Sequence, residues 1–277
     1  MNPIGIIQGL AVYRVGEGPP VCLIPYPHGF MLDPMVSGEL ANAFIRLGRQ
    51  VISFDPPGAF ASTRPMKADM AEMLACTHES LDYCGITEPI DIAGHSMGSL
   101  CAIGYALERP AGVKRLILVG TMSGWPAIMR HGRHRVYGVL NPRFWRLAYL
   151  GLRVQSGRGS LKTFKQLFNL MESDSYYKRE LAPVLPVAAD DNRRPIPGRM
   201  QWTRHQSAID YSQRLAEIRN STMVCVGRHD IETPPVINQE VADAIPDARI
   251  EFFESSGHSP FIEEPERFQQ VIRDFLA

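Results

Sequence analysis

Short apolar runs alternate with longer segments of helical spacing along most of the chain, and this alternation constrains the fold more than any other feature. The runs are rich in β-branched and aliphatic residues and end at glycine, proline or polar residues, as strands do. We expect strands at 20–25, 51–54, 90–93, 116–119, 222–226 and 249–253, and helices at 36–47, 66–84, 100–108, 236–244 and 265–275. Alternating strands and helices build a mostly parallel sheet covered by helices on both faces, so the sequence predicts an α/β fold.

The alternation stops between residues 121 and 210, where the sequence indicates helices and loops punctuated by proline. Formal net charge is zero for the whole chain, but its two parts differ in charge. The segment from Trp125 to His205 has 15 Lys and Arg against 5 Asp and Glu, and the rest has 14 against 24. We therefore expect a basic helical insertion at 123–209 within a core formed by 1–122 and 210–277.

Composition excludes several classes of protein. The zero net charge gives no nucleic-acid signature, and no apolar run reaches the roughly 18 residues of a membrane span. The five cysteines are scattered without a C-x-x-C pair, which favours reduced thiols and a cytoplasmic location over disulfides or a zinc site. The first residues lack the pattern of a signal peptide, and the chain contains no nucleotide-binding glycine motif, so we expect no cofactor and no metal.

The expected strand at 90–93 runs into the sequence Gly94-His95-Ser96-Met97-Gly98, and a helical segment follows. This G-x-S-x-G pattern between a strand and a helix is typical of a nucleophile elbow, in which the turn is so tight that the positions two before and two after the serine must be small. The alternative is an ordinary glycine-rich turn. The elbow would expose the Ser96 hydroxyl above a helix N-terminus, where backbone N–H groups can stabilise an oxyanion.

A serine nucleophile needs a base, and the base needs an orienting carboxylate. Asp230 follows the expected strand at 222–226, and His258 lies between the last strand and the last helix. Taken alone, Asp230 could be a turn or capping residue and His258 a solvent-facing loop residue. Strand ends of a parallel sheet meet at one edge, so the order Ser96, Asp230, His258 predicts that the three side chains come together.

In these motifs the chain resembles the serine hydrolases of the α/β-hydrolase superfamily. The resemblance rests on GHSMG, on GRHDIETP and on GHSPFIEEPERF, which occur in the family's order. It implies an eight-stranded type of sheet with a helical cap at the insertion. It also implies that Ser96 is the nucleophile, His258 the general base and then acid, and Asp230 the orienting carboxylate, in a reaction through an acyl-enzyme.

The same resemblance predicts the oxyanion hole. One donor is the backbone N–H of Met97, directly after the nucleophile. The second is the N–H of Phe30 in the loop after the first expected buried strand, with Met31 as the alternative because the Pro25-Tyr26-Pro27 lead-in departs from the family pattern.

Further predictions for the same neighbourhood concern His28 and the stretch FDPPGAFAS. His28 is more consistent with a structural hydrogen bond than with catalysis, although it is a candidate substrate contact. FDPPGAFAS resembles the family's Asp-x-x-Gly-x-G-x-S stretch with Phe60 at the second glycine. We expect Asp55 to be structural and Phe60 to bring an aromatic ring toward the site wall.

In the insertion, we expect the segment around His131 and His134 to be a solvated basic turn rather than a metal site, since no carboxylate or cysteine has ligand spacing. The apolar helix 143–153 with basic flanks could lie on a membrane, but we favour the underside of a lid. Trp125 and Trp145 are then candidate substrate contacts.

Arg and Lys dominate this cap, and we expect a small-molecule acyl substrate. The basic side chains could bind a negative charge on that substrate, or they could only solvate the outer face of the cap. We favour ester hydrolysis. The alternatives are a proline-iminopeptidase-like aminopeptidase, which would need acidic cap groups for a substrate ammonium, a lyase or acyltransferase, and a ligand-binding protein without turnover. The serine at position 96 disfavours dehalogenases and epoxide hydrolases, and monomer and homodimer are equally compatible with the sequence.

Overall fold

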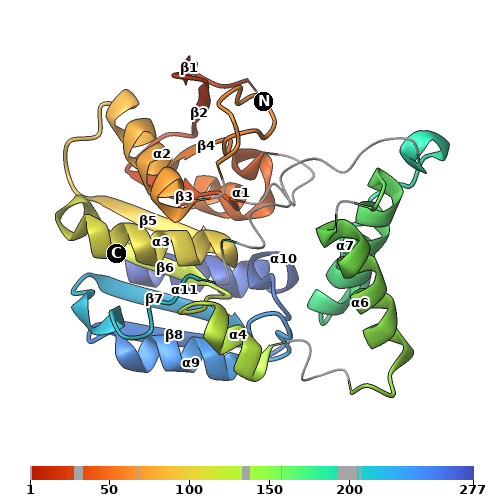
Figure 1. The fold of residues 1–277 in the computed structure, drawn as a ribbon. Coiled ribbons are helices and arrows are strands. Elements are labelled where there is room, and N and C mark those ends of the chain that lie inside the picture. Colours follow the sequence, from red (N-terminus) through yellow and green to blue (C-terminus); the bar gives the residue numbers. More distant parts are fainter. Residues whose placement is uncertain are drawn as a thin grey trace.

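The computed structural model describes residues 2–27, 34–67, 69–132, 138–156, 158–192, 205 and 208–277. Its centre is an eight-stranded sheet in the order β1-β2-β4-β3-β5-β6-β7-β8 (Figure 1). The strands are β1 Gly5–Ile7, β2 Leu10–Val15, β3 Pro20–Ile24, β4 Gln50–Phe54, β5 Ile90–His95, β6 Val113–Val119, β7 Ser221–Gly227 and β8 Ala248–Phe253. All pairs from β4 to β8 are parallel, which confirms the predicted α/β class and the mostly parallel sheet.

Two strands at the start of the chain were not among the expected elements. β1 and β2 form an antiparallel hairpin, and β2 adds to the edge of β4 in antiparallel register. The turn between them holds Gln8 at φ 47° and Gly9 at φ 82°, and positive φ at both central positions gives a hairpin turn whose twist suits the strands. The dipeptide Gln8-Gly9 is a weaker turn signal than Asn-Gly, so the local sequence does not specify this hairpin.

Helices cover both faces of the sheet, because alternate residues of the central strands point to opposite sides. One apolar core packs α2 (Met70–Tyr83), α3 (Met97–Glu108) and α9 (Pro235–Ala244) on the side of Ile24, Ile92 and Leu118. The other packs α1 (Glu39–Arg46), α10 (Pro260–Glu263) and α11 (Pro265–Leu276) on the side of Leu23, Ala93 and Ile117. Burial on both faces explains why these strands are continuous apolar runs.

Two expected helices begin later than predicted. The helix expected at 36–47 is a 3₁₀ turn, η1 Met35–Ser37, followed by α1, because Gly38 is extended at φ −82° and ψ 167° and interrupts the helical path. The helix expected from residue 66 begins at Met70, because the side chain of Asp69 accepts a hydrogen bond from Ala71 N at 3.1 Å and caps it there.

The segment between β6 and β7 is helical, and its helices α6 and α7 stand to one side of the layered core in Figure 1, whereas α4 lies next to α9. Its described elements are α4 Trp125–His131, α6 Pro142–Gln155, α7 Leu161–Ser175, η3 Arg179–Leu181 and η4 Ala189–Asn192, and η6 Leu215–Glu217 precedes β7, as η2 Pro110–Gly112 precedes β6. The helices α6 and α7 pack on each other through Leu150, Val154 and Leu167. We use "insertion" for residues 123–209.

The two ends of the insertion meet at the core. An isolated β-bridge joins Gly124 to Asp210, and Tyr211 N donates to Ser123 O at 2.8 Å. The segment therefore leaves and re-enters the core at one place. Within the described part of the chain, no helix combines the length and apolar character needed to cross a membrane.

Candidate active site

Ser96 stands between the end of β5 and the first turn of α3 in a strained backbone conformation. Its φ is 52° and its ψ is −122°, a region that residues with a β-carbon seldom occupy. A Cβ at Gly94 would collide with the backbone of Gly98, and a Cβ at Gly98 would lie 2.5 Å from Ile24 O. The glycines of the motif are therefore required by close backbone approach, as the elbow interpretation predicts, and Ser96 itself is only half-buried.

His258 and Asp230 are bonded to each other in the loops after β8 and β7. The distance between His258 Nδ1 and Asp230 Oδ2 is 2.8 Å, and both residues are buried. Because the carboxylate accepts this bond, Nδ1 carries the proton and Nε2 is left as the basic nitrogen. This is the arrangement that a general base and its orienting carboxylate require.

The Asp230 carboxylate is fixed by three further donors. Its Oδ1 accepts from Glu232 N at 2.8 Å and Thr233 N at 3.0 Å, and its Oδ2 accepts from Thr233 Oγ1 at 2.8 Å. These bonds come from the turn Asp230 itself begins, so the carboxylate has one orientation toward His258. Thr233 was not among the predicted site residues, although its place three residues after Asp230 is a signal for such a turn.

Gly120, the residue after β6, brings His258 and Ser96 to the same place. A Cβ at Gly120 would lie 2.9 Å from both Cε1 and Nδ1 of His258, and the residue has φ 53°. Its neighbour Val119 accepts the backbone hydrogen bond of Ser96 at 2.9 Å. The imidazole of His258 and the backbone of Ser96 are therefore adjacent across the end of β6, and only a glycine at 120 leaves room for the ring.

His95 connects the loop after β3 to the loop of His258. Its Nε2 lies 2.7 Å from the His258 carbonyl oxygen, and its Nδ1 is bonded to the Tyr26 hydroxyl. Burial, and then the charge of nearby His258, lowers the pKa of His95 well below 6.5. His95 is therefore neutral, donates from Nε2 to the carbonyl, and accepts at Nδ1 from Tyr26, whose pKa is raised well above 10.0 by burial.

Comparison with known proteins identifies the family to which this chain belongs. A family model described as alpha/beta hydrolase fold matches residues 26–265. The chain belongs to this α/β-hydrolase family.

Individual relatives agree with that assignment. A proline iminopeptidase of Clostridium botulinum is 25% identical over 262 residues, which cover 86% of this chain and 84% of the relative. A 2-hydroxymuconate semialdehyde hydrolase of a Pseudomonas species is 28% identical over 246 residues, covering 88% and 80%. An esterase structure from Exiguobacterium antarcticum superposes with a TM-score of 0.73 at 19% identity, covering 99% of each chain. Hydrolase chemistry of the α/β-hydrolase superfamily is what these comparisons support.

Other predicted residues of this α/β-hydrolase lie as follows. Phe60 has φ 45°, so it adopts the left-handed conformation that suits the glycine of the family pattern. Trp125 is the half-buried first residue of α4. Trp145 on α6 is 60% exposed, and its indole N–H donates to Val139 O at 2.7 Å, so the present contact of its polar atom is with its own loop. His28, Phe30 and Met31 lie outside the described residues, as does His134.

Asp55 has structural partners, as expected. The Tyr13 hydroxyl donates to its Oδ2 at 2.7 Å, and Ala61 N donates to the same oxygen at 2.9 Å. Burial, with the hydrogen bond to Asp55 second, raises the pKa of Tyr13 above its ordinary 10.0. Among the described residues, no cluster of three or more His, Cys, Asp or Glu side chains is arranged to hold a metal ion.

The end of α7 contacts the loop that carries His258 and the loop that carries Asp230. Ser175 O accepts from His258 N at 2.7 Å, and Ser175 Oγ donates to Glu232 at 2.6 Å. One turn earlier, the negative charge of Glu172 helps to raise the pKa values of Tyr26 and Tyr176. Ser175 therefore links Glu232, a carboxylate of the Asp230 loop, to the backbone of the candidate base.

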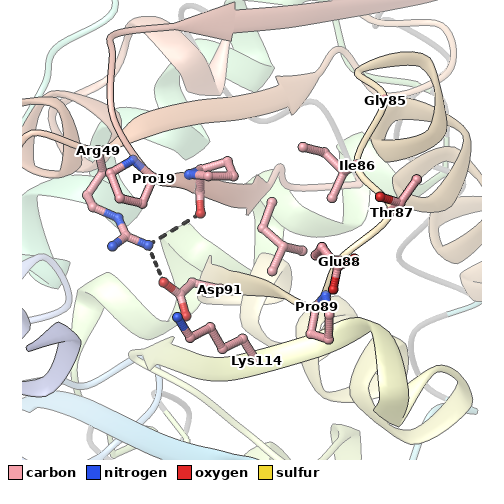
Figure 2. Close-up of a pocket in the computed structure, with 11 residues that line it drawn as sticks. Pro19, Arg49, Gly85, Ile86, Thr87, Glu88, Pro89, Asp91 and Lys114 are labelled. Atoms are coloured by element: carbon pink, nitrogen blue, oxygen red, sulfur yellow. Dashed lines mark hydrogen bonds and ion pairs between the residues drawn. The ribbon is translucent and has the colours of Figure 1, made fainter.

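A cavity of about 240 Å³ lies at the opposite edge of the sheet (Figure 2). It is lined by Pro19, Pro20, Arg49, Gly85, Ile86, Thr87, Glu88, Pro89, Ile90, Asp91 and Lys114. Pro20 and Ile90 are the first residues of β3 and β5, whereas Ser96 follows the last residue of β5. The lining contains no nucleophile beside a base, so its chemistry is that of ion pairs and backbone contacts.

Proposed function

We propose that this α/β-hydrolase is a serine hydrolase that cleaves an ester or related acyl bond of a small molecule through an acyl-enzyme. The observation that carries the proposal is the 2.8 Å bond between His258 Nδ1 and Asp230 Oδ2 beside a serine held at φ 52°. Strain and buried polar pairs of this kind persist where a site uses them.

In the first half-reaction His258 Nε2 removes the proton of Ser96 Oγ while the oxygen attacks the substrate carbonyl carbon. The carbonyl π electrons move to oxygen, and a tetrahedral intermediate forms. When it collapses, the bond to the leaving group breaks and His258 returns the proton to that group. The Asp230 carboxylate stabilises the transient imidazolium through its bond to Nδ1.

The negative oxygen of the intermediate needs donors placed where charge develops. The backbone N–H of Met97 is the first donor in the proposal, because α3 begins there and its N-terminal amides carry partial positive charge. The second donor remains the predicted N–H of Phe30.

In the second half-reaction water attacks the acyl carbon. His258 takes one proton from the water and gives it to Ser96 Oγ when the acid leaves, so the enzyme returns to its starting state. We also propose that residues 123–209 form the cap over this site, with 1–122 and 210–277 as the core. The contact of Ser175 with the His258 loop supports that assignment.

A second candidate, an aminopeptidase that releases an N-terminal residue, is favoured by one observation. Glu172 and Glu232 place negative charge around Tyr26, Tyr176 and Ser175, where a substrate ammonium could bind. The proline iminopeptidase relative agrees with this chemistry. The same charges argue against the anionic substrate considered from the basic composition of the insertion.

The test is labelling with a fluorophosphonate probe, which reacts only with an activated serine. We expect wild-type protein to label and Ser96→Ala not to label. Hydrolysis of 4-nitrophenyl acetate and 4-nitrophenyl butyrate is then compared with that of proline 4-nitroanilide.

Faster ester turnover supports the first candidate, and faster anilide turnover supports the second. Folded wild-type protein that neither labels nor hydrolyses would contradict the proposal and favour a ligand-binding protein. A protein that labels but transfers its acyl group to an alcohol rather than to water would be an acyltransferase.

A further inference from the structure

Glu263, the last residue of α10, is a buried carboxylate that the proposed mechanism does not use. It is 2% exposed, and an ionised carboxylate at such a position must be fully hydrogen-bonded to be tolerated. Burial raises its pKa, and surrounding backbone amides oppose that rise. The position of those amides in the chain shows what the carboxylate holds together.

Each oxygen of Glu263 binds a different segment. Oε1 accepts from Gly257 N at 2.7 Å, directly before His258. Oε2 accepts from Lys178 N at 2.9 Å, three residues after α7. The amides of Tyr177 and Ser259 act on the same carboxylate, so each segment contributes two donors. One side chain therefore joins the loop of the candidate base to the exit of α7.

The two segments are also in direct backbone contact. His258 N donates to Ser175 O at 2.7 Å. A Cβ at Gly257 would overlap Ser175 O and lie 2.9 Å from Tyr177 N. Because the two backbones are in direct contact, a shift of segment 175–178 toward 257–259 would displace that segment, and a shift of 257–259 would displace 175–178.

The exit of α7 is attached to the Asp230 loop as well. The Tyr177 ring stacks on His229 with centroids 4.0 Å apart and planes 13° apart. Ser175 Oγ donates to Glu232 at 2.6 Å. Segment 175–178 thus contacts the loops of both the candidate base and its carboxylate.

We propose that Glu263 is a positioning residue for the reaction: its carboxylate fixes the backbone of the His258 loop against segment 175–178, so that the insertion sets where the general base stands. This inference rests on the proposed function. Catalysis depends on sub-ångström placement, and a misplacement of about 1 Å can cost about 100-fold in rate.

The substitution Glu263→Gln separates the two contacts. A glutamine has one accepting oxygen and one NH₂ group, so one of the two segments would face a donor instead of an acceptor. Glu264→Gln is the matched control, because Glu264 accepts from Ser255 N at 2.8 Å and Ser256 Oγ at 2.6 Å. It holds the same loop without bonding to the insertion.

A second pair of variants acts from the insertion side and leaves the His258 loop intact. Lys178→Pro removes the N–H that binds Oε2, and the φ of −88° at this residue is near the proline range. Lys178→Ala keeps that N–H and removes the side chain beyond Cβ, including the ammonium that donates to the backbone oxygen of Glu263.

The experiment measures kcat and KM for 4-nitrophenyl butyrate, together with hydrogen exchange of the peptide containing 175–178. We expect Glu263→Gln and Lys178→Pro to lower kcat by about 10- to 100-fold with KM changed by less than about 3-fold. Exchange at 175–178 should accelerate in both, whereas Glu264→Gln and Lys178→Ala should stay within about 3-fold of wild type in kcat.

Unchanged kcat in folded Glu263→Gln, or an equal loss in Glu264→Gln, overturns the inference. If Glu263→Gln does not fold, Lys178→Pro against Lys178→Ala decides it. If wild-type protein itself neither labels nor hydrolyses, the proposed function fails, and unchanged exchange at 175–178 in Glu263→Gln would separately overturn the link between the segments.

Discussion

Polar groups have opposite roles at the amino ends and at the carboxyl ends of the parallel strands, called here the amino edge and the carboxyl edge of the sheet. Strand β5 has an example at each end. At its amino end Asp91 is bonded to Arg49, as Figure 2 shows. It is also bonded to Arg115, whose Nε lies 3.0 Å from the carboxylate. At its carboxyl end Ser96 is strained and only half-buried. At the amino ends the charges are paired with one another, whereas at the carboxyl ends a half-buried hydroxyl lies at the end of β5 and a buried imidazole is bonded to Asp230.

Residues that stabilise the fold and residues that the proposed reaction would use lie at opposite ends of the strands. Arg49 is 11% exposed, Arg115 is 16% exposed, and Asp91 is 1% exposed at the side chain. These ion pairs link the residue before β4 to β5 and β6. The carboxyl end of β5 is followed by Ser96 at positive φ, which costs folding free energy in a residue with a β-carbon and is typical of positions that a site uses. Substitutions at the two edges should therefore affect different measurements.

The largest effect is expected from Ser96→Ala. Removal of the proposed nucleophile should lower kcat by at least about 10⁴-fold, as in enzymes with a Ser-His-Asp triad, while the free energy of unfolding changes by less than about 0.5 kcal/mol because the strained backbone is retained. Ester hydrolysis and urea unfolding check the two parts. Residual turnover above 1% of wild type would break the assignment of Ser96.

Asp91→Ala should show the reverse pattern. Removal of the carboxylate leaves two largely buried guanidinium groups without their partner, and breaking such a pair costs about 3 kcal/mol. We expect a lower urea midpoint with kcat of the folded protein within about 2-fold of wild type. A large loss of kcat at low urea would mean that the two edges are coupled.

The pH dependence of stability should come from His95 at the carboxyl edge. Its pKa is lowered in the folded state, so the unfolded chain binds the proton more readily, and stability is lost as the pH falls below about 6.5, by at most about 1.4 kcal/mol per pH unit. His95→Gln should flatten this acid limb in urea titrations between pH 7 and pH 5. An unchanged slope would assign the limb to other groups.

The smallest effect is expected from Ser96→Gly. Glycine accepts φ near 52° without a β-carbon, so the free energy of unfolding should rise by about 1 kcal/mol relative to Ser96→Ala. Chemical denaturation of the two inactive variants measures this directly. Equal stabilities would show that the backbone at Ser96 stores little strain.

The sequence by itself determined the α/β fold and the positions of the strands along the chain from 20 to 253, because strands buried on both faces must be apolar runs and their connections must be helical. Their order in the sheet came from the tertiary structure. The sequence also singled out Ser96, Asp230 and His258, since residues after parallel strands share one edge of the sheet. Their roles remain predictions. The helix expected at 36–47 begins only at Glu39 because Gly38 has an extended backbone, and the spacing of apolar residues does not indicate that conformation.

Tertiary structure alone decided which distant residues hold those three in place. Gly120 leaves space for the His258 ring, Tyr26 reaches His95, and Glu263 spans from the His258 loop to Lys178. Each contact joins segments far apart in the chain, and nothing in the local pattern of either segment specifies its partner. A carboxylate at the end of a short helix looks the same in sequence whether it meets water or the backbone amides of two segments, and only the packing of the insertion on the core distinguishes the two.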